Sequence, residues 1–166
     1  MSDVAGFEVR GVLADEAATE RLGAVVGARL RPGQAVALLG DLGAGKTCFA
    51  RGIGRGMGID DPDAVCSPTY LLVIEHPGPL PMIHIDAYLP DKTRAFLADG
   101  GIDYLAERRG VAVVEWADRL ADLLPVETLW VTLAPAPCGS GREVVLVDRT
   151  AGAFPFLRDV RESLFE

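Results

Sequence analysis

Residues 35–47 decide the fold of this chain and read AVALLGDLGAGKT, an apolar run followed by a glycine-rich loop. The apolar run 35–39 is typical of a strand buried on both faces of a parallel sheet. Residues 40–47 match the pattern GxxxxGK[ST] in full. We expect a glycine-rich helix from Lys46 to about Met57, so the loop connects a strand to a helix. That arrangement is the one in which this pattern binds phosphate.

The chemistry of the loop predicts a nucleoside triphosphate site. Glycines at positions 40, 43 and 45 permit backbone angles and close approaches that a Cβ would block. Backbone N–H groups and the positive end of the following helix would surround the β- and γ-phosphates. Lys46 would neutralise phosphate charge and assist catalysis, and the Thr47 hydroxyl would bind Mg²⁺. The predicted nucleotide contacts of this segment are Asp41, Leu42, Gly43, Ala44, Gly45, Lys46, Thr47 and Cys48.

Two acidic residues stand at the ends of predicted strands further along the chain. A phosphate loop needs such an acid to hold Mg²⁺ or its water. Glu115 follows the apolar run 111–114, and we expect it to bind the metal. Asp86 ends the strand 82–86, and we expect it to hold the metal's water or to orient the attacking water. His84 shares a strand face with Asp86 and is expected to be packed or hydrogen-bonded rather than a ligand.

The segment 66–70, which reads CSPTY, follows the loop helix and an acidic stretch. Its hydroxyl groups could approach a γ-phosphate in the manner of a switch, which makes Thr69 a candidate catalytic residue. A plain Ser-Pro turn that leads into a strand explains the same residues equally well. Trp116 is expected to pack structurally or to form an apolar lid beside the site.

Composition limits the functions that the chain can have. Its 166 residues predict a single domain over 1–166, and the formal net charge of −8 gives no general attraction to a nucleic acid backbone. The odd set of three cysteines, Cys48, Cys66 and Cys138, favours a cytoplasmic location with thiols acting as small hydrophobes. The N-terminus has no secretory pattern, and no apolar run approaches the ~18–20 residues of a membrane helix.

The remaining pattern mixes strands and helices. An alternating strand is expected at 7–12, and Asp15 is expected to cap a helix that ends before Pro32. One or two helices around Gly100 and Gly101 are expected at 92–109, and further helices at 118–124 and 154–165. Short strands are expected at 71–75, 82–86 and 111–114, and a hairpin of strands at 128–133 and 143–147. The fold class is therefore α/β, with helices on a mainly parallel sheet.

Four motifs in order resemble the bacterial TsaE family, the small ATPases required for threonylcarbamoyladenosine modification of tRNA. They are residues 40–47, then SPTY at 67–70, then HIDAY at 84–88, and VEW at 114–116. The resemblance covers roughly residues 15–147. It implies a three-layer P-loop NTPase sandwich with a mainly parallel central sheet and antiparallel additions.

The resemblance also implies a function and site residues. It implies an enzyme that hydrolyses ATP with Mg²⁺, and it places Thr47 and Glu115 at the metal. It implies partnership with the TsaB and TsaD proteins in modifying adenosine 37 of tRNAs that read ANN codons, with the tRNA reached through the complex. Glu16, Thr19 and Arg142 are further nucleotide contacts suggested by this likeness, and Asp86 is a residue on which activity depends.

Three positions depart from the family pattern, and two other functions compete. Leu89 replaces a usual Arg, Ala117 a usual Pro, and Cys48 a common Thr. A small-molecule kinase is the main alternative, although an acceptor pocket and an Arg-rich lid have thin support in the sequence. A nucleotide-binding module without turnover is disfavoured by the presence of both Asp86 and Glu115. No guanine-reading Asn-Lys-x-Asp motif occurs, which disfavours a GTPase.

Overall fold

The computed structural model describes residues 6–68, 72–101, 103, 109–150 and 152–164. Within these ranges, no helix has the length and apolar character to cross a lipid bilayer. The elements in chain order are β1 (Phe7–Leu13), α1 (Glu16–Gly27), β2 (Ala35–Leu39), α2 (Lys46–Met57), η1 (Pro62–Ala64), β3 (Val73–His76), β4 (Met82–Asp86), α3 (Pro90–Ala98), β5 (Val111–Glu115), η2 (Ala117–Leu123), β6 (Thr128–Pro135), β7 (Arg142–Asp148) and α5 (Leu157–Leu164).

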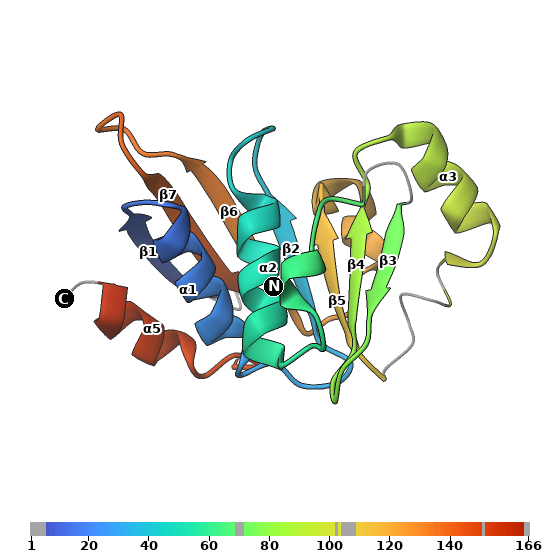
Figure 1. The fold of residues 1–166 in the computed structure, drawn as a ribbon, viewed down its shortest axis with the longest axis horizontal. Helices are drawn as coiled ribbons and strands as arrows, with labels where there is room; N and C mark the ends of the chain where they lie inside the picture. The colour runs from blue at the N-terminus through green and yellow to red at the C-terminus, as the bar shows by residue number, and fades with distance from the viewer. Residues whose placement is uncertain (1–5, 69–71, 102, 104–108, 151, 165–166) are drawn as a thin grey trace, which may run out of the picture.

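The strands form one twisted sheet in the order β1-β7-β6-β2-β5-β4-β3 (Figure 1). The four central strands, β6, β2, β5 and β4, run parallel. The edges are antiparallel, because β3 pairs with β4, and β7 pairs with both β6 and β1. The apolar runs in β2 and β5 thus correctly predicted a parallel centre, and the predicted antiparallel pair of late strands is confirmed.

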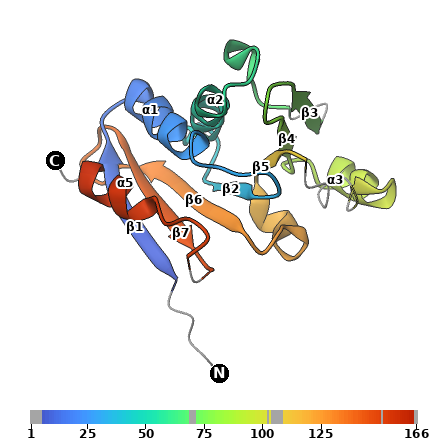
Figure 2. The ribbon, with the colours of Figure 1, turned by 90° about the horizontal axis from the view of Figure 1, so that it is seen from below.

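Helices cover both faces of the sheet and make three layers (Figure 2). On one face, apolar side chains of α1, α2 and α5 pack in one cluster with alternate residues of β2, among them Val36 and Leu38. On the other face, α3 and η2 pack with the intervening residues, among them Ala35 and Ala37. Residues 35–38 are completely buried between these layers. The strand β2 carries only apolar side chains, as is typical of a strand covered on both faces. The α/β sandwich expected from the sequence is confirmed.

Some predicted elements differ from those observed. The expected helix at 118–124 is a 3₁₀ helix, η2, and it ends before Leu124, where the following proline disfavours the α conformation. Helix α3 begins at Pro90, where a proline at the first helical position costs no hydrogen bond, and it ends at Ala98. Residues 102 and 104–108, which belong to the one or two helices expected at 92–109, lie outside the described residues, as does Leu71 of the expected strand 71–75.

The cysteines correct one expectation. All three are free thiols, but Cys66 and Cys138 are exposed and Cys48 is partly exposed. They therefore do not serve as small buried hydrophobes. Cys138 lies in an exposed loop beside Ser140, and hydrogen bonds with the backbone and side chain of Ser140 lower the pKa of its thiol.

Candidate phosphate and metal site

Glycines shape the loop between β2 and α2. Gly40, Gly43 and Gly45 have φ values of +146°, +77° and +106°, which residues with a Cβ rarely adopt. A Cβ at Gly40 would lie 2.4 Å from the carbonyl oxygen of Leu133 in β6. The loop therefore runs close against the neighbouring strand and delivers Lys46 as the first residue of α2. Backbone N–H groups at such a helix start attract anions.

The ammonium group of Lys46 lies inside the loop. Its Nζ donates to the carbonyl oxygens of Gly40 and Asp41, at 2.5 Å and 2.9 Å. It also lies 4.4 Å from the ring centroid of Trp116, a cation–π distance. The residue is 5% exposed. Burial lowers the pKa of Lys46, and the charge of Glu115, followed by Asp86 and Asp41, opposes this effect. The loop thus holds a desolvated cation that an anionic ligand would stabilise.

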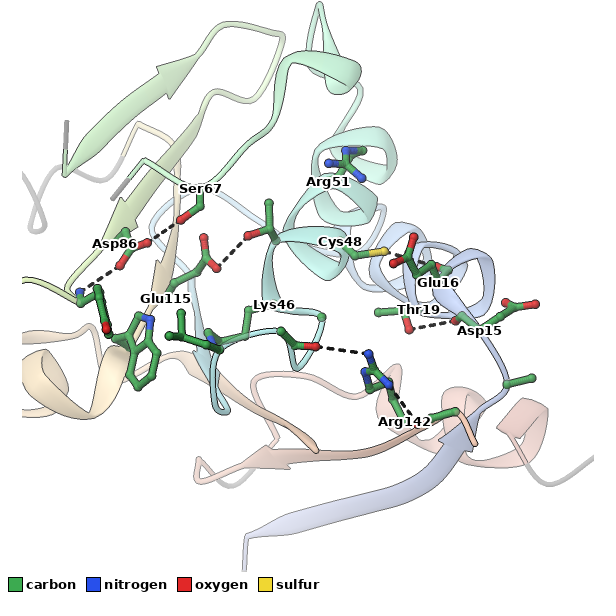
Figure 3. A pocket seen from close by; sticks show the side chains of 18 residues that line it. Asp15, Glu16, Thr19, Lys46, Cys48, Arg51, Ser67, Asp86, Glu115 and Arg142 are labelled. Atoms are coloured by element: carbon green, nitrogen blue, oxygen red, sulfur yellow. Dashed lines mark hydrogen bonds between the residues drawn. The ribbon is translucent and has the colours of Figure 1, made fainter. Parts of the chain in front are cut away.

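Thr47 and Glu115 meet at the carboxyl edge of the sheet (Figure 3). The Thr47 hydroxyl donates to Oε1 of Glu115 at 3.1 Å. The other oxygen, Oε2, lies 2.7 Å from Nε2 of His84, which is completely buried. The two residues that the sequence assigned to the metal are therefore brought together. A hydroxyl and a carboxylate are hard oxygen donors of the kind that Mg²⁺ uses beside substrate phosphates.

Asp86 lies next to Glu115, since the two residues are paired at the ends of parallel strands β4 and β5. Its Oδ2 accepts a hydrogen bond from the Ser67 hydroxyl at 2.6 Å, and its Oδ1 accepts one from the backbone N–H of Tyr88 at 2.9 Å (Figure 3). Only 2% of the residue is exposed. The structure thus joins Asp86 to the 66–70 segment through Ser67. Thr69, the predicted catalytic residue of that segment, lies outside the described residues.

Trp116 and Tyr88 form an aromatic wall beside Lys46. Their ring centroids are 5.0 Å apart, with the rings tilted by 44°. Trp116 has a φ of +57°, which is rare for a bulky residue and is often kept at functional sites. Trp116 packs partly against the second core cluster and also lines the pocket. The predicted packing of Trp116 is therefore observed, and the residue also lines the pocket, while its role as an apolar lid stays a prediction.

The start of α1 forms the opposite edge. Asp15 caps the helix as predicted, because its carboxylate accepts from the backbone N–H of Ala18 at 2.7 Å. The Thr19 hydroxyl donates to the carbonyl oxygen of Asp15 at 3.1 Å. The Cys48 thiol contacts the carbonyl oxygen of Glu16 at 3.3 Å, and burial raises the pKa of this thiol. A protonated thiol is the form that donates to a carbonyl, so Cys48 joins α2 to α1.

Arg142, at the start of β7, reaches the loop from the other side. Its Nε donates to the carbonyl oxygen of Ala44 at 3.0 Å, and its Nη2 donates to that of Gly43 at 3.2 Å. Its guanidinium group therefore braces the phosphate loop, which the sequence did not predict. Direct contact between Arg142 and a nucleotide remains a prediction.

These residues line a pocket of about 770 Å³, within the size range of small-molecule sites. The predicted residues that line it are Glu16, Thr19, Leu42, Gly43, Gly45, Lys46, Thr47, Cys48, Asp86, Glu115 and Arg142. Asp41 and Ala44 belong to the loop backbone but do not line the pocket. Arg51 also lines the pocket and was not predicted from the sequence. Its position one helical turn after Thr47 on α2 could have indicated that it faces the same site.

A buried parallel strand, a GxxxxGK[ST] loop and a helix that begins at its Lys define the P-loop class of proteins. Comparison with known proteins narrows this class. The family described as "Threonylcarbamoyl adenosine biosynthesis protein TsaE" matches residues 13–144. The chain therefore belongs to the TsaE family.

Individual relatives agree with the family assignment. The chain is 38% identical over 128 residues to tRNA threonylcarbamoyladenosine biosynthesis protein TsaE of Treponema pallidum, covering 77% of this chain and 92% of that protein. It is 42% identical over 126 residues to the Mycobacterium leprae protein of the same name, covering 69% and 75%. The crystal structure of Bacillus subtilis YdiB superposes with a TM-score of 0.78 at 26% identity, covering 95% of this chain and 97% of that one.

Proposed function

We propose that the chain binds ATP with Mg²⁺ in the described pocket and hydrolyses it as an accessory to tRNA threonylcarbamoylation. The modification is that of adenosine 37 in tRNAs reading ANN codons, carried out in the cytoplasm with the TsaB and TsaD proteins. The names of the relatives support the pathway. The observation that carries the biochemical part is the contact between Thr47 and Glu115 beside the phosphate loop.

The proposed binding step uses Lys46, the loop N–H groups and the oxygens of Thr47 and Glu115. Lys46 already donates to two carbonyl oxygens, and a phosphate would offer it charged acceptors instead. Thr47 and Glu115 would hold Mg²⁺, which would neutralise the developing charge on the phosphate oxygens. The loop contacts of Arg142 would keep the cradle in shape during binding.

The proposed catalytic step uses Asp86. Its carboxylate is fixed by Ser67 and by the Tyr88 backbone, so it can orient a water molecule toward the γ-phosphate. The bond to Ser67 links this carboxylate to the 66–70 segment. We therefore propose that docking on TsaB and TsaD acts on Asp86 through Ser67 and accelerates hydrolysis, with the tRNA reached through that complex.

Phosphate release from ATP tests this proposal. The assay compares the chain alone, the chain with TsaB and TsaD, and the chain with both proteins and tRNA. We expect slow release by the chain alone and faster release with the partners. Asp86→Ala is expected to lower the stimulated rate by about 10²–10⁴ while keeping ATP affinity. Fast release that the partners do not change would contradict the accessory role, and phosphate transferred to a metabolite would establish a kinase.

A further inference from the structure

His84 stands directly behind the carboxylate of Glu115. In the sheet, His84 of β4 pairs with Val113 of β5, and Glu115 lies two residues further along β5 on the same face. Nε2 of His84 is 2.7 Å from Oε2 of Glu115, while Oε1 of the same carboxylate accepts from Thr47 at 3.1 Å. The two oxygens of Glu115 thus face different partners, one in the core and one at the pocket.

Among the described residues, the imidazole of His84 hydrogen-bonds to this carboxylate through Nε2. His84 is completely buried and Glu115 is 3% exposed. Among the described residues, Nδ1 of His84 has no hydrogen-bond partner, and the nearby His76 ring is 6.3 Å away between centroids. An ionised carboxylate can only accept hydrogen bonds, so Nε2 is the donor to Glu115. A buried carboxylate oxygen without such a donor would raise the free energy of the folded protein.

We propose that His84 is a positioning residue that holds Glu115 in the orientation required to bind Mg²⁺. This inference rests on the proposed function. The hydrogen bond fixes Oε2 toward the core, and the geometry of the carboxylate then presents Oε1 to Thr47 and the pocket. Residues that hydrogen-bond to metal ligands set their orientation, and their loss typically costs 10–100-fold in metal affinity or activity.

The test measures ATP affinity across a range of Mg²⁺ concentrations in His84→Gln and His84→Asn. Both variants carry a neutral amide, but the longer Gln side chain brings an N–H near the position of Nε2, whereas Asn does not. We expect His84→Asn to raise the Mg²⁺ concentration at half-maximal effect by about 10–100-fold. We expect His84→Gln to restore most of this loss. ATP affinity without Mg²⁺ is expected to stay unchanged in both variants, which a general structural defect would not allow. If His84→Asn does not fold, His84→Phe fills the same space without a donor and repeats the test.

A double-mutant cycle with Glu115→Gln shows whether His84 acts through this carboxylate. We expect His84→Asn to have no further effect on the Mg²⁺ response once Glu115 is replaced. If Mg²⁺ tightens ATP binding by the wild type and His84→Asn has the same Mg²⁺ concentration at half-maximal effect, the inference about His84 is wrong and the proposed function stands. An equal loss in the Glu115→Gln background, or an equal loss of ATP affinity without Mg²⁺, would also overturn it. ATP binding by the wild type that Mg²⁺ does not affect would overturn the proposed metal role and this inference with it.

Discussion

At the scale of single residues, Lys46 is a buried cation held by carbonyl oxygens of its own loop. Burial lowers its pKa more than the charges of Glu115, Asp86 and Asp41 raise it, so the ammonium group is disfavoured in the protein without a ligand. Replacing the side chain therefore removes a ligand contact at small cost to the unliganded fold. The contribution of Lys46 to ATP binding can therefore be measured separately from its contribution to the stability of the protein without nucleotide.

We expect Lys46→Ala to weaken ATP binding by about tenfold to a hundredfold, because one hydrogen bond to a charged group contributes roughly 1.5–3 kcal/mol. The melting temperature without nucleotide should change little. Calorimetric titration with ATP measures the first quantity, and thermal unfolding measures the second. Lys92→Ala, which removes the same charge from the exposed side of α3, is the matched control and should bind ATP normally. Equal ATP affinity in Lys46→Ala and the wild type would contradict the assignment of the loop.

The residues of the site differ in how far the sequence could predict them. Thr47, Asp86 and Glu115 were predictable, because the carboxyl ends of parallel strands and the phosphate loop meet at the same edge of a sheet. The contact of His84 with Glu115 was not, since it depends on the register between β4 and β5. The sequence predicted that His84 is packed or hydrogen-bonded, but it did not identify Glu115 as the partner.

At the scale of elements, α1 and α2 lie side by side (Figure 1), and glycines let their backbones approach closely. A Cβ at Gly52 in α2 would lie 2.2 Å from the carbonyl oxygen of Glu20 in α1, and a Cβ at Gly56 would lie 2.0 Å from that of Ala24. Glycine is unfavourable inside a helix, so these positions are explained by close packing rather than by helix propensity. The contact fixes the direction of the helix that begins at the phosphate loop.

We expect Gly52→Ala to lower the free energy of unfolding by about 1–3 kcal/mol, because its methyl group must push two helix backbones apart. Gly54→Ala is the matched control on the same helix. Its Cβ would lie 2.7 Å from Cδ1 of Ile59, the end of a flexible side chain that can move. Gly54→Ala should therefore cost less, since alanine also improves helix propensity. Urea unfolding of both variants measures the difference, and equal stabilities would rule out the backbone contact.

The elements show where prediction from the sequence ends. The bounds of β2 and α2 were predictable because an apolar run and a phosphate motif mark them on both sides. The glycines of α2 were visible in the sequence, but their contact with α1 depends on how the two helices meet in space. A helix was expected at 118–124, and the structure has a tighter 3₁₀ helix at 117–123, which the sequence did not predict.

At the scale of the whole molecule, the sheet joins distant parts of the chain around one pocket. The first strand β1 pairs with the late strand β7, and Leu13 is paired with Arg142. On its other side β7 pairs with β6, which neighbours β2, and this strand order brings Arg142 to the phosphate loop, 98 residues from Ala44 in sequence. The alternating pattern of β1 predicted a half-buried strand but could not identify its partner, because many strands can present a matching face. The parallel centre was predictable, and the antiparallel edge at β1 was not.

Titration of the chain with ATP, with Mg²⁺ and with Mg²⁺ removed by a chelator, tests the central claim most directly. Calorimetry on the wild type and on Glu115→Gln, which keeps the shape of the side chain but loses its charge, supplies the comparison. We predict that Mg²⁺ tightens ATP binding in the wild type and that Glu115→Gln loses most of this effect while it still binds ATP without Mg²⁺. Absence of ATP binding by the wild type, or an equal Mg²⁺ response in both proteins, would contradict the account.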